Sequence, residues 1–141
     1  MNTETASNVI VRDTGFGDDD WTAGFAAPEA WAANSVAGVD LSNAVDPMTL
    51  ARYLDAPAIR IAFPNFADGR GFTLARRLRV LGYRGRLRAH GPIISDQYAM
   101  ARRAGFDEVE IPADLAARQP EGQWMFRADW QGHDYQSRLR A

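Results

Sequence analysis

Hydrophobic positions begin to recur regularly at Val36, and from there to about residue 111 they predict alternating strands and helices. Short apolar runs predict strands, and apolar residues three or four positions apart predict helices. We expect strands over residues 38–42, 59–63, 86–90 and 109–111. We expect helices over residues 47–54, 72–81 and 95–104. The first helix has Asp46 as its N-cap and Pro47 as its first residue, which is the preferred order at a helix start.

A glycine followed by an aromatic residue ends the second and third helices, at Gly82-Tyr83 and Gly105-Phe106. This pair is typical of a Schellman cap with its hydrophobic contact. The alternation of strands and helices every roughly 20–25 residues predicts a parallel sheet with right-handed crossovers. We therefore expect an α/β fold, a single domain of consecutive βα units with a parallel sheet of about four strands. A flavodoxin-like or Rossmann-like open sheet and a half-barrel are the alternatives, since the chain is too short for a closed barrel.

The two ends of the chain depart from this pattern. Residues 1–35 contain only a short β-like run, Val9-Ile10-Val11, and we expect them to form an irregular N-terminal arm. The α/β domain is then expected over residues 36–141. Its aromatic C-terminal tail is expected to pack on the domain or on a second subunit of a homodimer. The tail's aromatic residues include Trp124, Phe126, Trp130 and Tyr135.

The composition excludes several kinds of chemistry. The 141 residues are 46% hydrophobic, which is enough to form a core without disulfides or metal ions. All 16 basic residues counted as Lys and Arg are arginine, and the chain contains no cysteine. Schiff bases, phosphate-binding lysines, thiol nucleophiles, iron–sulfur ligation and zinc fingers are therefore excluded. A GC-rich genome accounts for the bias toward arginine.

The charges are segregated along the chain. Residues 1–58 carry 2 Arg against 9 acidic residues, residues 59–105 carry 10 against 2, and residues 106–141 carry 4 against 7. The basic middle third can attract an anion, or it can pair with the acidic thirds. Nucleic acid is not an expected partner, because the sequence pI is about 5.6 and no nucleic-acid-binding motif is present. No apolar run spans a membrane and no secretory signal precedes the domain, so we expect a cytoplasmic protein.

The loops after the strands at 59–63 and 86–90 carry the candidate site, because open parallel sheets bind ligands at the carboxyl ends of their strands. Backbone N–H groups at a helix start, the Arg70 guanidinium and the Thr73 hydroxyl suit a small oxyanion or a phosphate. A purely structural alternative is that Asp68 caps the helix and that Arg70 pairs with Asp68 or Asp96. The expected ligand-binding residues are Asn65, Asp68, Gly69, Arg70, Gly71, Thr73, Arg88, His90, Asp96 and Gln97.

His90 and Asp68 are the candidate catalytic residues. Arg88 and His90 share strand parity, so both can meet a ligand on the same side of the sheet. A lone histidine is also commonly a satisfied core or loop residue. His90 and His133 lie far apart, and no metal-ligand spacing is present, so we expect no metal site. The Gly69-Arg70-Gly71 segment lacks the third glycine of a dinucleotide-binding loop, and the sequence indicates no particular cofactor.

A long ordered motif extends across residues 36–111. It consists of Phe63-Pro64-x-Phe66-x-Asp68-Gly69-Arg70-Gly71-Phe72, Ala75-Arg76-x-Leu78-Arg79-x-x-Gly82-Tyr83-x-Gly85-x-Leu87-Arg88-Ala89-x-Gly91, Asp96-Gln97 and Arg103-x-Gly105-Phe106-Asp107. This motif resembles the bacterial domain-of-unknown-function family 934. Members of that family are small cytoplasmic proteins usually encoded beside assimilatory sulfite reductase and described as probable oxidoreductases or accessory proteins of sulfite reduction. Members commonly carry cysteine where this chain has Ala104, and often lysine where it has Asn65.

The resemblance and the loops together lead to one expected function and two alternatives. We expect an accessory protein of assimilatory sulfite reduction that binds a small anion or an anionic cofactor group, such as that of a nucleotide, at the strand ends. One alternative is an oxidoreductase that uses a dissociable flavin or nicotinamide. The other is a non-catalytic interaction module whose arginine-rich helix docks on a sulfite reductase subunit.

Overall fold

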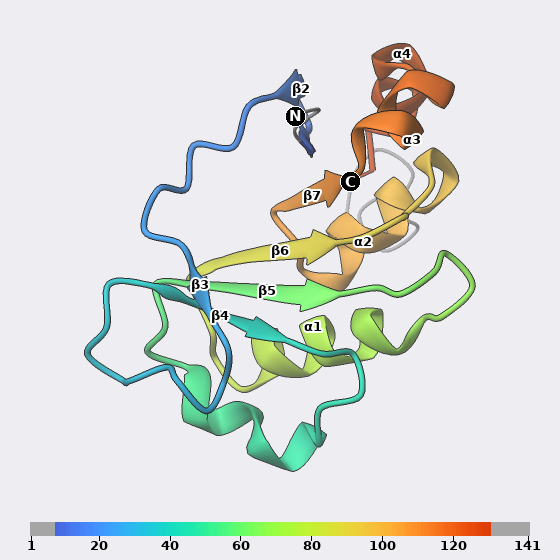
Figure 1. Cartoon of the computed structure of the whole chain (residues 1–141). Helices are drawn as coiled ribbons and strands as arrows, with labels where there is room; N and C mark the ends of the chain where they lie inside the picture. The colour runs from blue at the N-terminus through green and yellow to red at the C-terminus, as the bar shows by residue number, and fades with distance from the viewer. Residues whose placement is uncertain (1–7, 131–141) are drawn as a thin grey trace.

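A seven-stranded mixed sheet forms the centre of the structure, a computed structural model that describes residues 8–130 (Figure 1). The strands are β1 (Val9–Arg12), β2 (Gly15–Gly17), β3 (Phe25–Ala26), β4 (Gly38–Leu41), β5 (Ala58–Ala62), β6 (Arg86–His90) and β7 (Glu108–Ile111). The 3₁₀ helices are η1 (Pro47–Tyr53) and η2 (Ser95–Gln97), and the α-helices are α1 (Arg70–Val80), α2 (Tyr98–Ala104), α3 (Ala113–Arg118) and α4 (Glu121–Met125).

The strand order is β2-β1-β7-β6-β5-β4-β3. Strands β3 to β7 are parallel and adjacent in chain order, whereas β1 is antiparallel to both β7 and β2. The prediction of a parallel sheet of about four strands is therefore wrong in strand number and direction, although the α/β class holds. The order lacks the reversal of flavodoxin-like and Rossmann-like sheets. The antiparallel strand β1 also distinguishes the sheet from a half-barrel of parallel strands.

The irregular N-terminal arm is a second incorrect prediction, because the described part of residues 1–35 supplies three strands. Strands β1 and β2 form a hairpin whose first strand pairs with β7, with Val9 opposite Ile111 and Val11 opposite Val109. Strand β3 pairs with β4 at the other edge of the sheet. Residues 18–24 connect the two edge strands, so this segment must cross the sheet. The pairing partners lie too far away in the sequence for a local pattern to indicate them.

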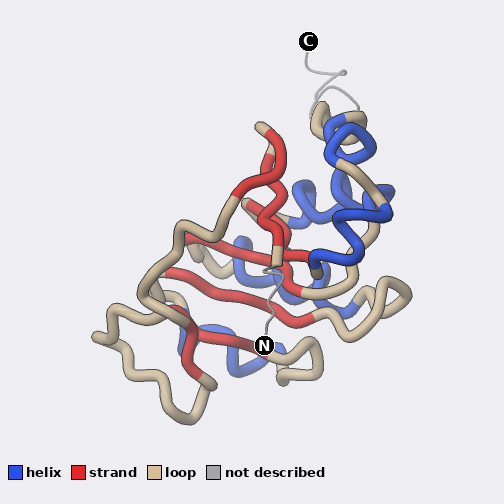
Figure 2. Tube along the Cα trace, turned by 45° about the horizontal axis from the view of Figure 1, so that its top comes forward, coloured by secondary structure: helices blue, strands red, loops and turns tan. Residues whose placement is uncertain are grey.

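The two faces of the sheet differ in chemistry. Helices η1, α1 and α2 lie on one side of the sheet (Figure 2). On this side, alternate strand residues such as Ile59, Ile61 and Leu87 belong to the same hydrophobic core as Leu74 and Leu78 of α1. The intervening strand residues point to the other face and are largely charged. One register row across β4, β5, β6 and β7 consists of Asp40, Arg60, Arg88 and Glu108.

Local capping signals are reproduced with changes in helix type and start. Asp46 caps η1 and accepts a hydrogen bond from Met48 N, but this element is a 3₁₀ helix rather than the expected α-helix. Helix α1 begins at Arg70, two residues before the expected start. Both Schellman caps are confirmed. Gly105 has φ +119° at the end of α2, and the amide of the next residue, Phe106, donates to Ala101 O.

Two short helices follow β7 where the sequence pattern gave no expectation. Trp124 of α4 is fully buried against Phe16 of β2 and Tyr98 of α2, so part of the aromatic tail does pack on the domain. Phe126 is exposed, and Tyr135 lies outside the described residues. Among residues 8–130, no helix combines the length and apolar character that crossing a bilayer requires.

Candidate functional site

The loops that follow β5 and β6 meet at the carboxyl edge of the sheet, as expected. The Phe63 amide donates to His90 O at 2.7 Å, and the Gln97 side chain donates through Nε2 to Phe66 O at 2.6 Å. Gly91 has φ +143°, and a Cβ there would lie 2.1 Å from Phe63 O. A side chain at Gly91 is therefore incompatible with this close approach of the two loops.

The ten expected ligand-binding residues separate into three groups. Arg70, Gly71 and Thr73 belong to the first turn of α1, and Asn65, Asp68 and Gly69 lie just before it. Arg88 and His90 lie on the opposite, charged face of the sheet. Asp96 is bound by Arg127 at 2.6 Å, and Gln97 links the two loops. The structure therefore does not bring Arg70 and Arg88 to one ligand.

A pocket of about 310 Å³ lies beside the first turn of α1, between this helix and the segment that follows β4. Its polar lining comes from Asn43, Arg70 and Thr73. Its apolar lining comes from Ala44, Val45, Pro47 and Leu74. The volume lies at the lower end of the range of about 300–1,000 Å³ for small-molecule sites. We call this space the α1 pocket.

Asn43 is the functional candidate that the sequence reasoning missed. Its side chain is 7% exposed, and Nδ2 is the one buried side-chain nitrogen or oxygen without a hydrogen bond of normal length within residues 8–130. Its polar contact with the Asp68 carboxylate is a weaker one. An unsatisfied buried donor is unfavourable by about 1–3 kcal/mol and requires an explanation, such as a bound ion or water. Asn43 follows a strand at its carboxyl end, and this position is the only signal the sequence offered.

Asp68 and Arg70 form a two-point ion pair beside the α1 pocket. Arg70 Nε and Nη2 donate to the two carboxylate oxygens at 3.1 and 2.8 Å, and Arg70 N also donates to Oδ1. These bonds hold the pKa of Asp68 well below its ordinary value, and a weaker polar contact from Asn43 acts in the same direction. Asp68 is therefore ionised at neutral pH. The structural alternative of an Asp68–Arg70 pair is confirmed.

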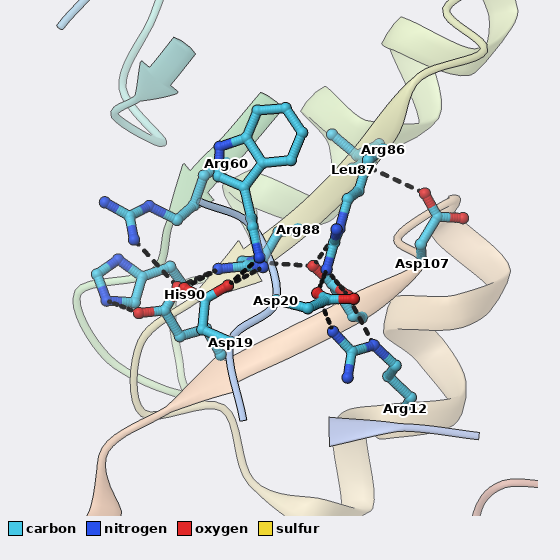
Figure 3. A network of polar contacts seen from close by, with 12 residues as sticks. Arg12, Asp19, Asp20, Arg60, Arg86, Leu87, Arg88, His90 and Asp107 are labelled. Atoms are coloured by element: carbon cyan, nitrogen blue, oxygen red, sulfur yellow. Dashed lines mark hydrogen bonds and ion pairs between the residues drawn. The ribbon is translucent and has the colours of Figure 1, made fainter. Parts of the chain in front are cut away.

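Arg88 is the centre of a buried network on the charged face (Figure 3). Its side chain is 1% exposed and donates to Glu108 at 2.7 Å, to Glu110 at 2.9 Å and to Asp19 at 2.9 and 3.0 Å. Burial alone would lower the pKa of Arg88, but the three carboxylates raise it above its ordinary value. With every terminal nitrogen engaged, Arg88 holds protein carboxylates where the sequence analysis expected a ligand anion.

His90 lies at the rim of the same network, beside a hollow of about 410 Å³ lined in part by Asp40, Ser42 and Ala62. Its Nε2 is 3.5 Å from Glu110 Oε2. Burial lowers the pKa of His90, and the nearby Glu110 charge only partly opposes this effect. The imidazole is thus neutral at pH 7 and can accept or donate one proton at the hollow. Asp68, the other candidate catalytic residue, is separated from it by the sheet.

The described residues contain no group of three or more His, Asp or Glu side chains that could hold a metal ion.

Gly71 has a packing role, because a Cβ there would lie 2.4 Å from the Phe63 ring. Close helix packing, and not approach to a dinucleotide, accounts for this glycine.

A family model described as "Bacterial protein of unknown function (DUF934)" matches residues 38–140. The chain belongs to this family. The match begins at β4 and includes the α1 pocket, both loops at the carboxyl edge and the charged strands β5, β6 and β7. No curated protein and no solved structure shows significant similarity to the chain.

Proposed function

We propose that this DUF934 protein binds a small oxyanion in the α1 pocket and acts as an accessory protein of assimilatory sulfite reduction. The observation that carries the proposal is the buried Asn43 side-chain amide beside the first turn of α1, whose Nδ2 forms no hydrogen bond of normal length within residues 8–130. Sulfite, sulfate and the phosphate of a nucleotide share the oxygen acceptors that this donor requires. The sulfite-reduction role comes from the family resemblance, and its partner in that role is a sulfite reductase subunit.

The donors around the pocket suit an oxyanion. Helix α1 has 11 residues, and its N-cap residue, Gly69, has no side chain to cap it, although the Arg70 amide already donates to Asp68 Oδ1. The N–H groups of a first helical turn lack intrahelical partners and carry partial positive charge. Asn43 Nδ2, the Thr73 hydroxyl and the remaining donor Nη1 of Arg70 add side-chain donors beside this turn. No thiol or amine chemistry is involved, consistent with a chain without Cys or Lys.

The Asp68 carboxylate limits the affinity of such a site. It already neutralises Arg70, so an entering anion shares the guanidinium with a fixed carboxylate. The Arg70 side chain is exposed and that of Asp68 is partly exposed, so solvent screening weakens the attraction between them. We therefore expect a binding site that releases its anion readily. A Kd of about 1 mM, which corresponds to a binding free energy of about −4 kcal/mol, is expected. Weak binding suits a protein that passes an anion on.

Isothermal titration calorimetry with sulfite, sulfate and inorganic phosphate tests the binding step. We expect saturable binding of one anion to the wild-type protein and a loss of about tenfold or more in Arg70→Ala, since about 1.4 kcal/mol corresponds to a factor of ten. Arg118→Ala is the matched control, because Arg118 is exposed and lies on α3. Equal binding by wild type and Arg70→Ala would overturn the proposal.

Growth of a strain that lacks the gene tests the cellular role. We expect the strain to grow poorly with sulfate as the sulfur source and normally with cysteine. The wild-type gene should restore growth on sulfate, whereas the Arg70→Ala gene should not. Normal growth of the deletion strain on sulfate would remove the sulfite-reduction role and leave the binding result unaffected.

A further inference from the structure

The outer surface of the helix layer has a strong positive charge that the α1 pocket does not use. Helices η1, α1 and α2 contain arginines but no aspartate or glutamate. Helix α1 packs between η1 and α2, so the three elements form one continuous layer (Figure 1). Their buried residues face the sheet, and the remaining positions face outward.

Most arginines of the described residues bind carboxylates. Of those that do not, four lie on η1, α1 and α2, and Arg84 lies in the turn that follows α1. On the sheet face, Arg12, Arg60, Arg86 and Arg88 are all paired with acidic side chains. Within residues 8–130 five exposed arginines have no carboxylate partner, and we call them the arginine face: Arg52, Arg76, Arg77, Arg84 and Arg103. Four of these arginines, all except Arg52, belong to the basic middle third of the chain, which therefore does not pair with the acidic thirds at these four positions.

Each of the elements η1, α1 and α2 also carries an exposed apolar side chain near the arginine face. Met48 of η1 is 81% exposed, Val80 of α1 is 72% exposed and Met100 of α2 is 49% exposed. Arginine and methionine are enriched in protein–protein interfaces relative to the rest of protein surfaces. Surfaces that bind single-stranded nucleic acid instead combine cations with exposed aromatic rings for stacking, and none of the three side chains is aromatic.

We propose that the arginine face docks on an acidic surface of a partner protein. Unpaired guanidiniums gain carboxylate partners in such a complex, and Met48, Val80 and Met100 supply apolar contact between them. The chain as a whole carries a net charge of −2, so attraction to an acidic partner must come from a local surface such as this one. The proposal does not depend on oxyanion binding, because no residue of the arginine face lines the α1 pocket.

Biolayer interferometry of the full chain on immobilised poly-L-glutamate tests the docking surface, with short duplex DNA as the competing class of ligand. We expect wild type to bind poly-L-glutamate at low salt and to lose affinity as ionic strength rises. The double substitution Arg76→Glu and Arg77→Glu should weaken binding about tenfold or more. Arg118→Glu reverses a charge on α3, outside the arginine face. The affinity of this variant for poly-L-glutamate should lie within about twofold of the wild-type affinity.

Arg76 and Arg77 form no ion pair within the described residues, so reversal should leave thermal unfolding unchanged. If the charge-reversal variant unfolds at a lower temperature, the neutral double variant Arg76→Gln and Arg77→Gln replaces it, and this variant should also bind poly-L-glutamate more weakly than wild type. Equal binding by wild type and either folded double variant would overturn the proposal. Tighter binding to the duplex than to poly-L-glutamate would also overturn it, in favour of nucleic acid.

Discussion

Both carboxylate oxygens of Asp19 accept hydrogen bonds from the guanidinium of Arg88, at 2.9 and 3.0 Å, although the two residues are 69 positions apart in the sequence. Asp19 belongs to the segment between β2 and β3, and Arg88 lies in the middle of the sheet. Phe25, the first residue of β3, packs against the guanidiniums of Arg60 and Arg88, with 4.4 and 5.5 Å from each guanidinium carbon to the ring centroid. Carboxylates and an aromatic ring therefore cover the charged face, whereas the buried apolar sides of η1, α1 and α2 cover the opposite face.

Removing the centre of the network should destabilise the fold strongly. Arg88→Met removes the guanidinium that binds both buried carboxylates, Glu108 and Glu110, and breaking buried pairs in this way is unfavourable by about 3–5 kcal/mol. We expect a loss of this size in the free energy of unfolding measured with urea. Arg118→Met, which removes one partner of an exposed pair, should change stability by less than about 1 kcal/mol. A loss in Arg88→Met as small as that would show that the network contributes little.

Asp19→Asn should loosen the covering segment without unfolding the domain. The amide keeps one hydrogen-bond acceptor but loses its charge, and Asp19 is 41% exposed, so we expect a loss of only about 1 kcal/mol. Hydrogen exchange at Trp21 N, which bonds Asp19 Oδ1, should be faster than in wild type. Asp18→Asn is the matched control, since Asp18 forms no ion pair within the described residues. Identical exchange in both variants would contradict the role of Asp19 as an anchor.

The charged face should make the protein less stable as the pH falls. Burial lowers the pKa of folded His90, so the unfolded chain binds this proton more readily, and stability declines as pH falls through about 6.5 and below. Hydrogen bonds from Arg88 lower the pKa of Asp19, whose contribution is present above its unfolded pKa near 3.9 and is lost as pH falls further. His90→Gln should remove the first decline only. Urea titrations from pH 8 to 5 measure it, and an unchanged decline in His90→Gln would contradict this assignment.

Asp68→Asn should strengthen anion binding in the α1 pocket. The substitution keeps an oxygen to accept from Arg70 N, but it frees the guanidinium from its fixed counter-charge. We expect sulfate to bind about tenfold more tightly than to wild type, as measured by calorimetry. Asp114→Asn, which frees Arg118 on α3, is the matched control and should have no effect. Weaker binding in Asp68→Asn would show that Arg70 does not contact the anion.

The parts of the fold that could be predicted from the sequence are those with local causes. The Gly82 and Gly105 caps were predictable because a Schellman cap is written in two adjacent residues. Strands β4 to β7 were predictable because each is a short segment with apolar residues at alternate positions between turn signals. Strands β1 and β2 were not, because β1 gains its stability from pairing with β7 about a hundred residues later. The Val9–Val11 run was the only local sign of it.

The site shows the same limit. Strand polarity correctly placed the loops after β5 and β6 at one edge, but it could not tell which face of the sheet each side chain would occupy relative to a ligand. Arg88 looked free in the sequence because its partners Asp19 and Glu108 come from distant segments. Asn43 looked unremarkable because the absence of a hydrogen-bond partner is a property of the folded chain alone.

The side-chain amide of Asn43 gives the most direct test of oxyanion binding in the α1 pocket. In nitrogen–proton correlation spectra of the amide-labelled protein, we predict that the Nδ2 resonances of Asn43 shift saturably as sulfite or sulfate is added and do not shift with equal ionic strength of chloride. The Asn8 amide, which is bonded to Glu110 on the charged face, should stay in place. Asn43 resonances that respond equally to chloride, or that do not move while sulfate binds, would contradict the account.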